Sequence, residues 1–143
     1  MKCAFCEFSK GIKKVHNNGY PFLFLRQSKL IFSFLASDPP KKGFHIILTT
    51  KNHYGSFEDI PEKITVLLMK EMQFIVKKIR SKKYGCNILM NEGKSAGQTE
   101  RHVHVHIISR EKNDGTKIEI WKRRKIGKKS FLMIQDKVRK LMV

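Results

Sequence analysis

Short apolar runs separated by polar turns dominate the first fifty residues. Residues 22–27 (FLFLRQ) and 30–36 (LIFSFLA) are rich in aromatic and aliphatic side chains. They flank a polar pair at 28–29, which predicts two strands joined by a tight turn. A loop rich in proline and glycine follows. Residues 44–50 (FHIILTT) are β-branched and aromatic, and they predict a third strand.

The hydrophobic period then changes from that of a strand to that of a helix. Apolar residues recur at intervals of four, four, three and four, as one face of a helix requires: Ile64, Leu68, Met72, Ile75 and Ile79. We expect this helix to run from residue 61 to about residue 83, and a weaker pattern predicts a short C-terminal helix at 130–142. Further strands are predicted at residues 86–90, 102–108 and 117–121. The order of elements predicts an α+β fold, with an antiparallel sheet of about five strands packed with the long helix.

The composition is that of one basic domain. The chain has 143 residues, 41% of them hydrophobic, which suits a single domain with an ordinary core. Thirty basic residues against twelve acidic ones give a net charge of +18, which favours anionic partners such as nucleotides or nucleic acid. Every apolar run is shorter than the ~20 residues of a membrane span, and the first residues lack the apolar stretch of a signal peptide. We therefore expect a cytoplasmic protein with no membrane partner.

Three histidines, His102, His104 and His106, alternate with apolar residues. In a strand, alternate side chains project from the same face, so the imidazoles would be lined up roughly 7 Å apart. Val103, Val105 and Ile107 would enter a core on the other face. Imidazoles can serve as nucleophile, base, acid or metal ligand, so the pattern favours a functional site over a half-buried strand that happens to carry histidine.

The loop that precedes the histidines contains glycine, amide and hydroxyl groups. Residues 91–99 (NEGKSAGQT) would let backbone N–H groups approach a phosphate closely. Taken alone, such a loop is a plain connection between strands. Joined directly to the histidines, it predicts a phosphate site beside them.

These segments together resemble the histidine-triad (HIT) family of nucleotide hydrolases and transferases. Residues 102–108 (HVHVHII) are similar to the His-φ-His-φ-His-φ-φ signature of that family, where φ is apolar. The resemblance continues in Asn91, Gly93, residues 97–99 (GQT) and residues 43–53, and it covers roughly residues 3 to 110. It implies a HIT-like nucleotide-binding catalytic domain over 1–110, followed by a basic extension, 111–143, packed on the same domain.

The resemblance implies a mechanism and assigns residues to it. His104 would attack the α-phosphorus of a nucleotide and form a nucleotidyl-histidine, which water or another acceptor would then release. His106 would bind the α-phosphate, and His45 would support the cluster from a neighbouring strand. The nucleotide-binding residues implied are Asn91, Gly97, Gln98, Thr99 and Ser37. No catalytic metal is needed for this chemistry.

The chain departs from the family pattern at two positions. Family members usually carry an aspartate, which binds the ribose, eight residues before the histidine that matches His45. Here that position is Ser37, with Asp38 beside it. Thr50 replaces the usual proline before Lys51.

The cysteines suggest a metal site rather than disulfides. Three cysteines do not make a disulfide framework, and Cys86 is predicted to be a small core residue. A subset of the family pairs an N-terminal C-x-x-C with the histidines that match His53 and His102. The resemblance therefore implies a structural Zn²⁺ held by four residues: Cys3, Cys6, His53 and His102. Idle reduced thiols and a redox pair are the alternatives.

The substrate and partners stay open at this stage. The resemblance implies a purine nucleotide or dinucleotide substrate and a homodimer. The substrate class is either a nucleoside phosphoramidate or adenylated amine (Hint-type) or a dinucleoside polyphosphate (Fhit-type). The alternative is a basic nucleic-acid-binding module, or an enzyme that acts on adenylated nucleic-acid ends. A hydrolase with a catalytic metal held by the histidines ranks last, because no carboxylate ligand lies at a recognisable spacing.

Overall fold

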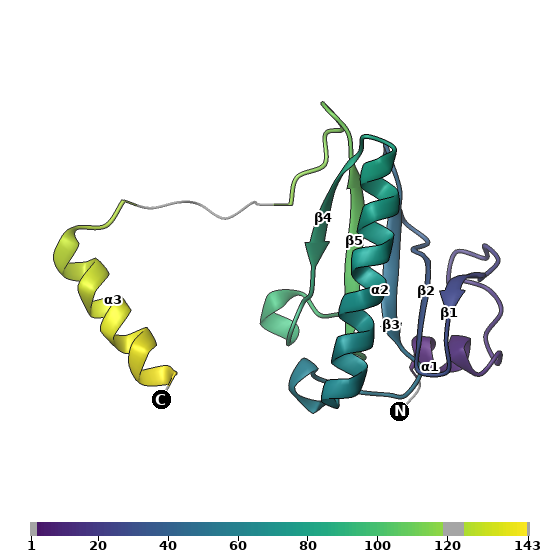
Figure 1. The fold of residues 1–143 in the computed structure, drawn as a ribbon, viewed down its shortest axis with the longest axis horizontal. Helices are drawn as coiled ribbons and strands as arrows, with labels where there is room; N and C mark the ends of the chain where they lie inside the picture. Colours follow the sequence, from purple (N-terminus) through teal and green to yellow (C-terminus); the bar gives the residue numbers. More distant parts are fainter. Residues whose placement is uncertain (1–2, 119–124, 143) are drawn as a thin grey trace.

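The computed structural model describes residues 3–118 and 125–142, and its centre is a five-stranded antiparallel sheet (Figure 1). The strands run in the order β1-β2-β3-β5-β4. Their bounds are β1 Phe24–Gln27, β2 Ile31–Leu35, β3 His45–Thr50, β4 Gly85–Leu89 and β5 His104–Arg110. The helices are α1 Ala4–Ser9, α2 Glu62–Ser81 and α3 Lys128–Leu141, with short 3₁₀ turns η1 Phe57–Asp59 and η2 Lys94–Ala96. The predicted α+β class and the predicted helices and sheet are thereby confirmed.

The structure differs from the predicted elements at the start of β5, at the N-terminus and after residue 116. The last sheet strand begins at His104 rather than at residue 102, because the His102 N–H bonds the Glu100 carbonyl and the Val103 N–H bonds the Tyr54 carbonyl, outside the ladder. The helix α1 was not predicted, since six residues are too few for a periodic pattern. The strand predicted at 117–121 lies mostly outside the described residues, and residues 117 and 118 are not in a strand.

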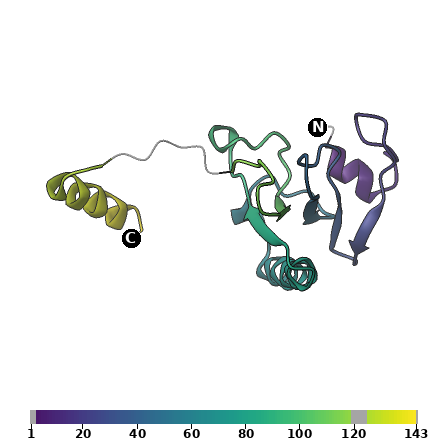
Figure 2. The same cartoon turned by 90° about the horizontal axis from the view of Figure 1, so that it is seen from above.

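The two faces of the sheet carry different cores. Seen along the sheet in Figure 2, α2 lies on one side and α1 on the other. The α2 face is aliphatic and joins Leu48, Val105 and Ile107 to one side of α2. The α1 face is aromatic and packs Phe5 and Phe8 of α1 against the sheet residues Phe22, Phe32, Phe34 and Ile47.

The strand register puts three histidines on the aromatic face. His106 lies opposite Ile47, His104 lies opposite Thr49, and His45 lies opposite Ile108. Side chains of directly opposite residues share a face, so all three imidazoles project toward the side of α1. The valines and Ile107 between them enter the α2 core, as their alternation predicts.

Gly43 fixes the start of β3 beside β5. Its φ of +90° is a conformation that L side chains rarely adopt, and an added Cβ would lie 2.4 Å from the Ser109 hydroxyl oxygen. That hydroxyl accepts a hydrogen bond from the Phe44 N–H, at 2.8 Å. The glycine therefore permits the close pairing that brings His45 beside the histidines of β5.

The segment just after β5 and the helix α3 differ in burial. Asp114 is buried and forms an ion pair with Arg110, so residues just after β5 stay close to the sheet. In contrast, no residue of α3 is buried, and Figure 1 shows α3 apart from the sheet. That residues 111–143 pack on the same domain stays a prediction. No helix within the described ranges has the length and apolar character needed to cross a bilayer.

Candidate active site and metal centre

His104 is held in one orientation by the backbone. Its Nδ1 lies 2.7 Å from the carbonyl oxygen of His102. A carbonyl can only accept, so Nδ1 carries the proton and donates it, which leaves the lone pair of the neutral ring on Nε2. Burial lowers the pKa of His104 below its ordinary value, which favours this neutral form at pH 7. A neutral imidazole with a free Nε2 is a competent nucleophile or base.

His45 and His106 form a pair next to His104. His45 Nε2 and His106 Nδ1 are 2.9 Å apart, so one ring donates a hydrogen bond to the other. The pKa of His106 is lowered to about 4, mainly by burial and in smaller part by the neighbouring His104 and His45. Burial also lowers the pKa of His45. Both rings are therefore neutral near pH 7 and act through hydrogen bonds rather than through charge.

A cavity of about 410 Å³ opens in front of His104 and His106. One part of its wall is apolar and is formed by α1 and the sheet, with Phe5, Phe8, Phe34 and Ile47. The remainder is polar, with Lys13, His16, Asn17, Ser37, Thr99 and Glu100. An apolar wall joined to a few converging polar groups is typical of a small-molecule site, and the volume suits a nucleotide-sized ligand.

The structure brings only some of the predicted nucleotide-binding residues to this cavity. Ser37 and Thr99 line it. Gln98 instead turns into its own loop, where its Oε1 accepts from the Gly93 N–H at 2.9 Å and its Nε2 donates to the Gly55 carbonyl at 3.3 Å. Asn91 and Gly97 are not among the residues that line the cavity. In this arrangement Gln98 shapes the loop rather than the cavity wall.

Several cavity residues were missed by sequence reasoning. Phe5 and Phe8 come from α1. The only sequence signal of this helix is the three-residue spacing between the two phenylalanines. Lys13, His16 and Asn17 come from the irregular segment after α1, which has no period at all. Glu100 adjoins the histidine run, yet its charge is opposite to that expected beside a phosphate.

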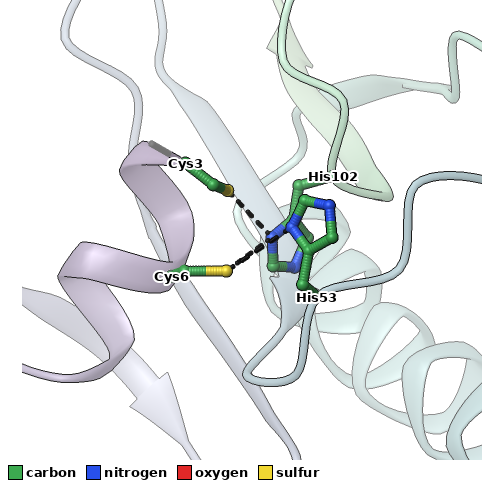
Figure 3. Close-up of side chains that lie close together, drawn as sticks. All are labelled: Cys3, Cys6, His53 and His102. Carbon is green, nitrogen blue, oxygen red and sulfur yellow. Dashed lines mark hydrogen bonds between the residues drawn. The ribbon is translucent and has the colours of Figure 1, made fainter. Parts of the chain in front are cut away.

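A second cluster lies at the N-terminal end of the histidine run. Cys3 and Cys6 of the α1 region face His53 and His102 (Figure 3). The Cys3 Sγ is 3.3 Å from the His102 Nδ1, and the Cys6 Sγ is 3.5 Å from the Nδ1 of both His53 and His102. All four ligand atoms lie within 4.8 Å of one another. These four residues could therefore hold one metal ion.

The spacing of this cluster fits a tetrahedral ion. With bonds of about 2.3 Å to sulfur and about 2.0 Å to nitrogen, ligand sulfur and nitrogen atoms are separated by roughly 3.6 Å. Burial and the neighbouring Cys3 raise the pKa of Cys6 to about 11 against the opposing effect of Lys10, so Cys6 on its own is a neutral thiol near pH 7. A bound divalent cation supplies positive charge and deprotonates the thiols.

The orientation of His102 also suits metal binding. Its Nε2 lies 3.0 Å from the Thr50 carbonyl oxygen and 2.9 Å from the Thr50 hydroxyl. The hydroxyl donates to the Asn52 carbonyl at 2.7 Å, so both Thr50 oxygens can accept from the His102 Nε2–H. The Nδ1 lone pair is then left for the cluster, as in metal-bound histidines whose other nitrogen is held by a carbonyl. Thr50, which stands where proline was expected, thus contributes to the site.

The sequence and the fold are those of a known family. A sequence model of the HIT domain matches residues 20–113, and the chain belongs to the HIT family. The protein is 32% identical over 114 residues to an uncharacterized HIT-like protein of Methanocaldococcus jannaschii, covering 79% of this chain and 82% of the relative. A HIT family protein of Bacillus subtilis has a similar crystal structure, with a TM-score of 0.79 and 23% identity over 98% of this chain and 96% of that chain.

Two further relatives bear names that describe an activity. One is the adenosine 5'-monophosphoramidase of Schizosaccharomyces pombe, 30% identical over 108 residues, with 76% of this chain and 74% of the relative covered. The other is an adenylylsulfatase of Arabidopsis thaliana, 29% identical over 116 residues, with 78% of this chain covered. The chain spans about half of that second relative, 54% of its length.

The pKa of His106 predicts how stability depends on pH. An unfolded histidine binds a proton near pH 6.5, whereas folded His106 does so only near pH 4. The unfolded chain binds more protons between these values, so the free energy of unfolding falls as the pH decreases from about 6.5 to about 4. We expect denaturant titrations of a His106→Asn variant to show a shallower decrease over this range. Parallel curves for the variant and the wild type would contradict the assignment.

Proposed function

We propose that this protein cleaves nucleotides at the α-phosphorus through a covalent nucleotidyl-histidine. The Nε2 lone pair of His104 forms a bond to phosphorus while the bond to the leaving group breaks, and the leaving group takes up a proton. Water then attacks the same phosphorus, the N–P bond breaks, and the nucleoside monophosphate is released. The observation that carries the proposal is the bond from His104 Nδ1–H to the His102 carbonyl, which leaves Nε2 free beside the cavity.

The other cavity residues are proposed to bind the nucleotide. His106, supported by His45, would donate to an α-phosphate oxygen, and Thr99 would contact phosphate or leaving-group oxygens. Ser37 would contact the ribose with a hydroxyl in place of a carboxylate. Asn91, Gly97 and Gln98 remain proposed nucleotide-binding residues that would act by shaping the loop above the phosphate.

We infer that the preferred leaving group is an amine rather than a phosphate. The carboxylate of Glu100 lines the cavity and is close enough to His104 to raise the pKa of that ring, against the larger effect of burial. A negative charge there attracts a cationic amine and repels the additional phosphates of a dinucleoside polyphosphate. The name of the Schizosaccharomyces pombe relative agrees with this choice.

We propose that the four-residue cluster binds Zn²⁺ with a structural role. Two cysteine and two histidine ligands fill a tetrahedral shell and leave no position for a substrate. A bound ion would tie α1, the loop around His53 and the start of β5 to one another. The reducing cytoplasm, which we propose as the location, keeps such cysteines in the thiol form.

We propose that the protein forms a homodimer through α2 and the β4 edge of the sheet. β4 ends the sheet, and Ile88 and Val66 are exposed on β4 and α2.

Nucleic-acid binding stays the alternative function. The observation in its favour is the set of exposed cations on α3, Lys128, Lys129, Lys137, Arg139 and Lys140.

Replacement of His104 tests the reaction. We expect a His104→Asn variant to keep its fold and to lose turnover of an adenosine phosphoramidate by roughly 10⁴-fold or more, because the nucleophile is gone. Rapidly quenched wild-type enzyme should show an intact mass increased by one nucleotidyl group, and the variant should not. Comparable turnover by the two proteins would overturn the proposal.

Replacement of Glu100 tests the leaving group. Glu100→Gln keeps the shape of the side chain and removes a charge worth on the order of 1 kcal/mol near a partly buried site. We expect the ratio of kcat/KM for an amine leaving group to that for diadenosine triphosphate to fall roughly fivefold. Glu92→Gln, which removes the same charge from a side chain bonded to the Phe57 N–H, is the matched control. An unchanged ratio in Glu100→Gln would remove this inference.

Metal analysis tests the zinc site. Elemental analysis of the purified protein should find one zinc ion per chain, and Cys6→Ser should lose it. Chelation should lower the Tm by roughly 10 °C or more, because the binding free energy also stabilises the fold. Cys86→Ser, a cysteine outside the cluster, is the control and should keep the metal. Retention of zinc by Cys6→Ser would contradict the ligand set.

A further inference from the structure

A second hollow lies on the opposite face of the sheet from the histidines. It has a volume of about 290 Å³ and is lined by residues of α2 and of strands β1 to β3, together with Phe44 and Tyr84. We call it the α2 groove. Its walls are mainly apolar side chains from both layers: Leu25, Phe44, Ile46, Phe74, Ile75 and Ile79.

The floor of the α2 groove contains a polar group that lacks a partner. Ser33 of β2 is 1% exposed and lines the groove, and its hydroxyl has no hydrogen-bond partner among the described residues. The neighbouring positions on this face, Ile31 and Leu48, are aliphatic and fill the core. A serine there leaves space where a larger side chain would pack. Buried hydroxyls are nearly always paired, so this one indicates a ligand that supplies the partner.

The rim of the α2 groove is positively charged. Lys78 of α2, Lys82 just after the end of α2 and Arg26 of β1 line it, and no acidic side chain does. Arg26 is already engaged by Glu71 and lies 4.0 Å above the ring centre of Phe74. Lys78 and Lys82 have no such ion-pair partner among the described residues. An apolar floor below two cations fits an anion that carries an apolar chain.

We propose that the α2 groove binds a short amphipathic carboxylate. Its carboxylate lies at Lys78 and Lys82, its aliphatic or aromatic body covers the apolar floor, and a hydrogen-bonding group at the far end pairs with Ser33. The volume equals that of roughly ten water molecules at ~30 Å³ each, which suits a small ligand such as an eight-carbon carboxylate. That volume is the lower end of the range for ligand pockets.

The charge of the rim argues against α3 as the occupant. The exposed apolar stripe of α3, which includes Phe131, Ile134 and Val138, would otherwise fit an apolar groove. That helix is itself strongly basic, and its lysines would face Lys78 and Lys82. Docking α3 of this chain or of a second copy would therefore bring like charges together, whereas a carboxylate neutralises the rim.

The test is a titration of the full-length protein with three probes of similar length, followed by two-dimensional NMR. The probes are octanoate, 8-hydroxyoctanoate and octan-1-ol. We expect both carboxylates to shift the amide signals of β2 and the C-terminal half of α2 with millimolar or lower Kd, and octan-1-ol to bind at least threefold more weakly. Shifts confined to the histidine cavity would overturn the proposal, as would equal affinity for octan-1-ol. Shifts of the β1 and β2 signals on protein concentration alone would assign the groove to a second copy and would also overturn it, since these strands lie at the other end of the sheet from the proposed dimer edge at β4.

Two sets of variants separate the parts of the site. The double change Lys78→Gln and Lys82→Gln should weaken octanoate binding roughly threefold to tenfold and leave octan-1-ol unchanged. The matched control is Lys77→Gln with Arg80→Gln, which removes the same charge from exposed residues of α2 outside the groove. Equal weakening by both pairs would show a nonspecific charge effect and would contradict the proposal.

The role of Ser33 is tested by a thermodynamic cycle that changes one residue of the protein and one group of the ligand. Ser33→Ala should bind octanoate as well as the wild type and should lose, roughly fivefold, the preference for 8-hydroxyoctanoate. Turnover of the phosphoramidate should be unchanged, since Ser33 lies on the other face of the sheet from His104. A preference that survives in Ser33→Ala would show that the hydroxyl does not contact the ligand, and would overturn this part of the assignment.

Discussion

The hydrogen bond from His104 Nδ1–H to the carbonyl of His102 is the interaction on which the site depends. It sets which nitrogen of His104 carries the lone pair. The residue that provides the carbonyl also faces Cys3 and Cys6 with its own ring. His102 therefore connects the cysteine–histidine cluster to the ring of His104. Its own position is fixed further by the hydrogen bond to Thr50. Any displacement of α1 or of the His53 loop would move the acceptor that orients His104.

The alternation of β5 explains how one strand serves both a core and a reactive surface. Val105 and Ile107 are 2% and 0% exposed on the α2 face, so the strand cannot shift by one residue without burying imidazoles in aliphatic surroundings. The register of β5 against β3 brings His45 beside His106 in the same way. The packing of the aliphatic face thus fixes the geometry of the polar one.

The sequence predicted the parts of the molecule that follow a period. The five sheet strands, α2 and α3 all match apolar patterns in the sequence. The histidines and cysteines to which the resemblance assigns roles lie in two neighbouring clusters. Residues that depend on tertiary contact were not predictable. The helix α1 is six residues long, and Phe5 contacts His104 through the tertiary packing of α1 against the sheet. Gln98 lies in the expected loop, but its bonds to Gly93 and Gly55 turn it away from the cavity.

In the proposed function, the local charge of the cavity differs from the positive charge of the whole protein, because Glu100 lines the cavity together with Lys13. A chain with a net charge of +18 attracts nucleotides from any side, so overall charge can concentrate substrates but cannot select among them. Selection requires a local feature of opposite sign, and Glu100 is that feature in the cavity. Its effect on His104 opposes that of burial, and burial is the larger, so the ring keeps a lowered pKa. In the proposed reaction, the carboxylate can therefore act on the leaving group while His104 stays unprotonated.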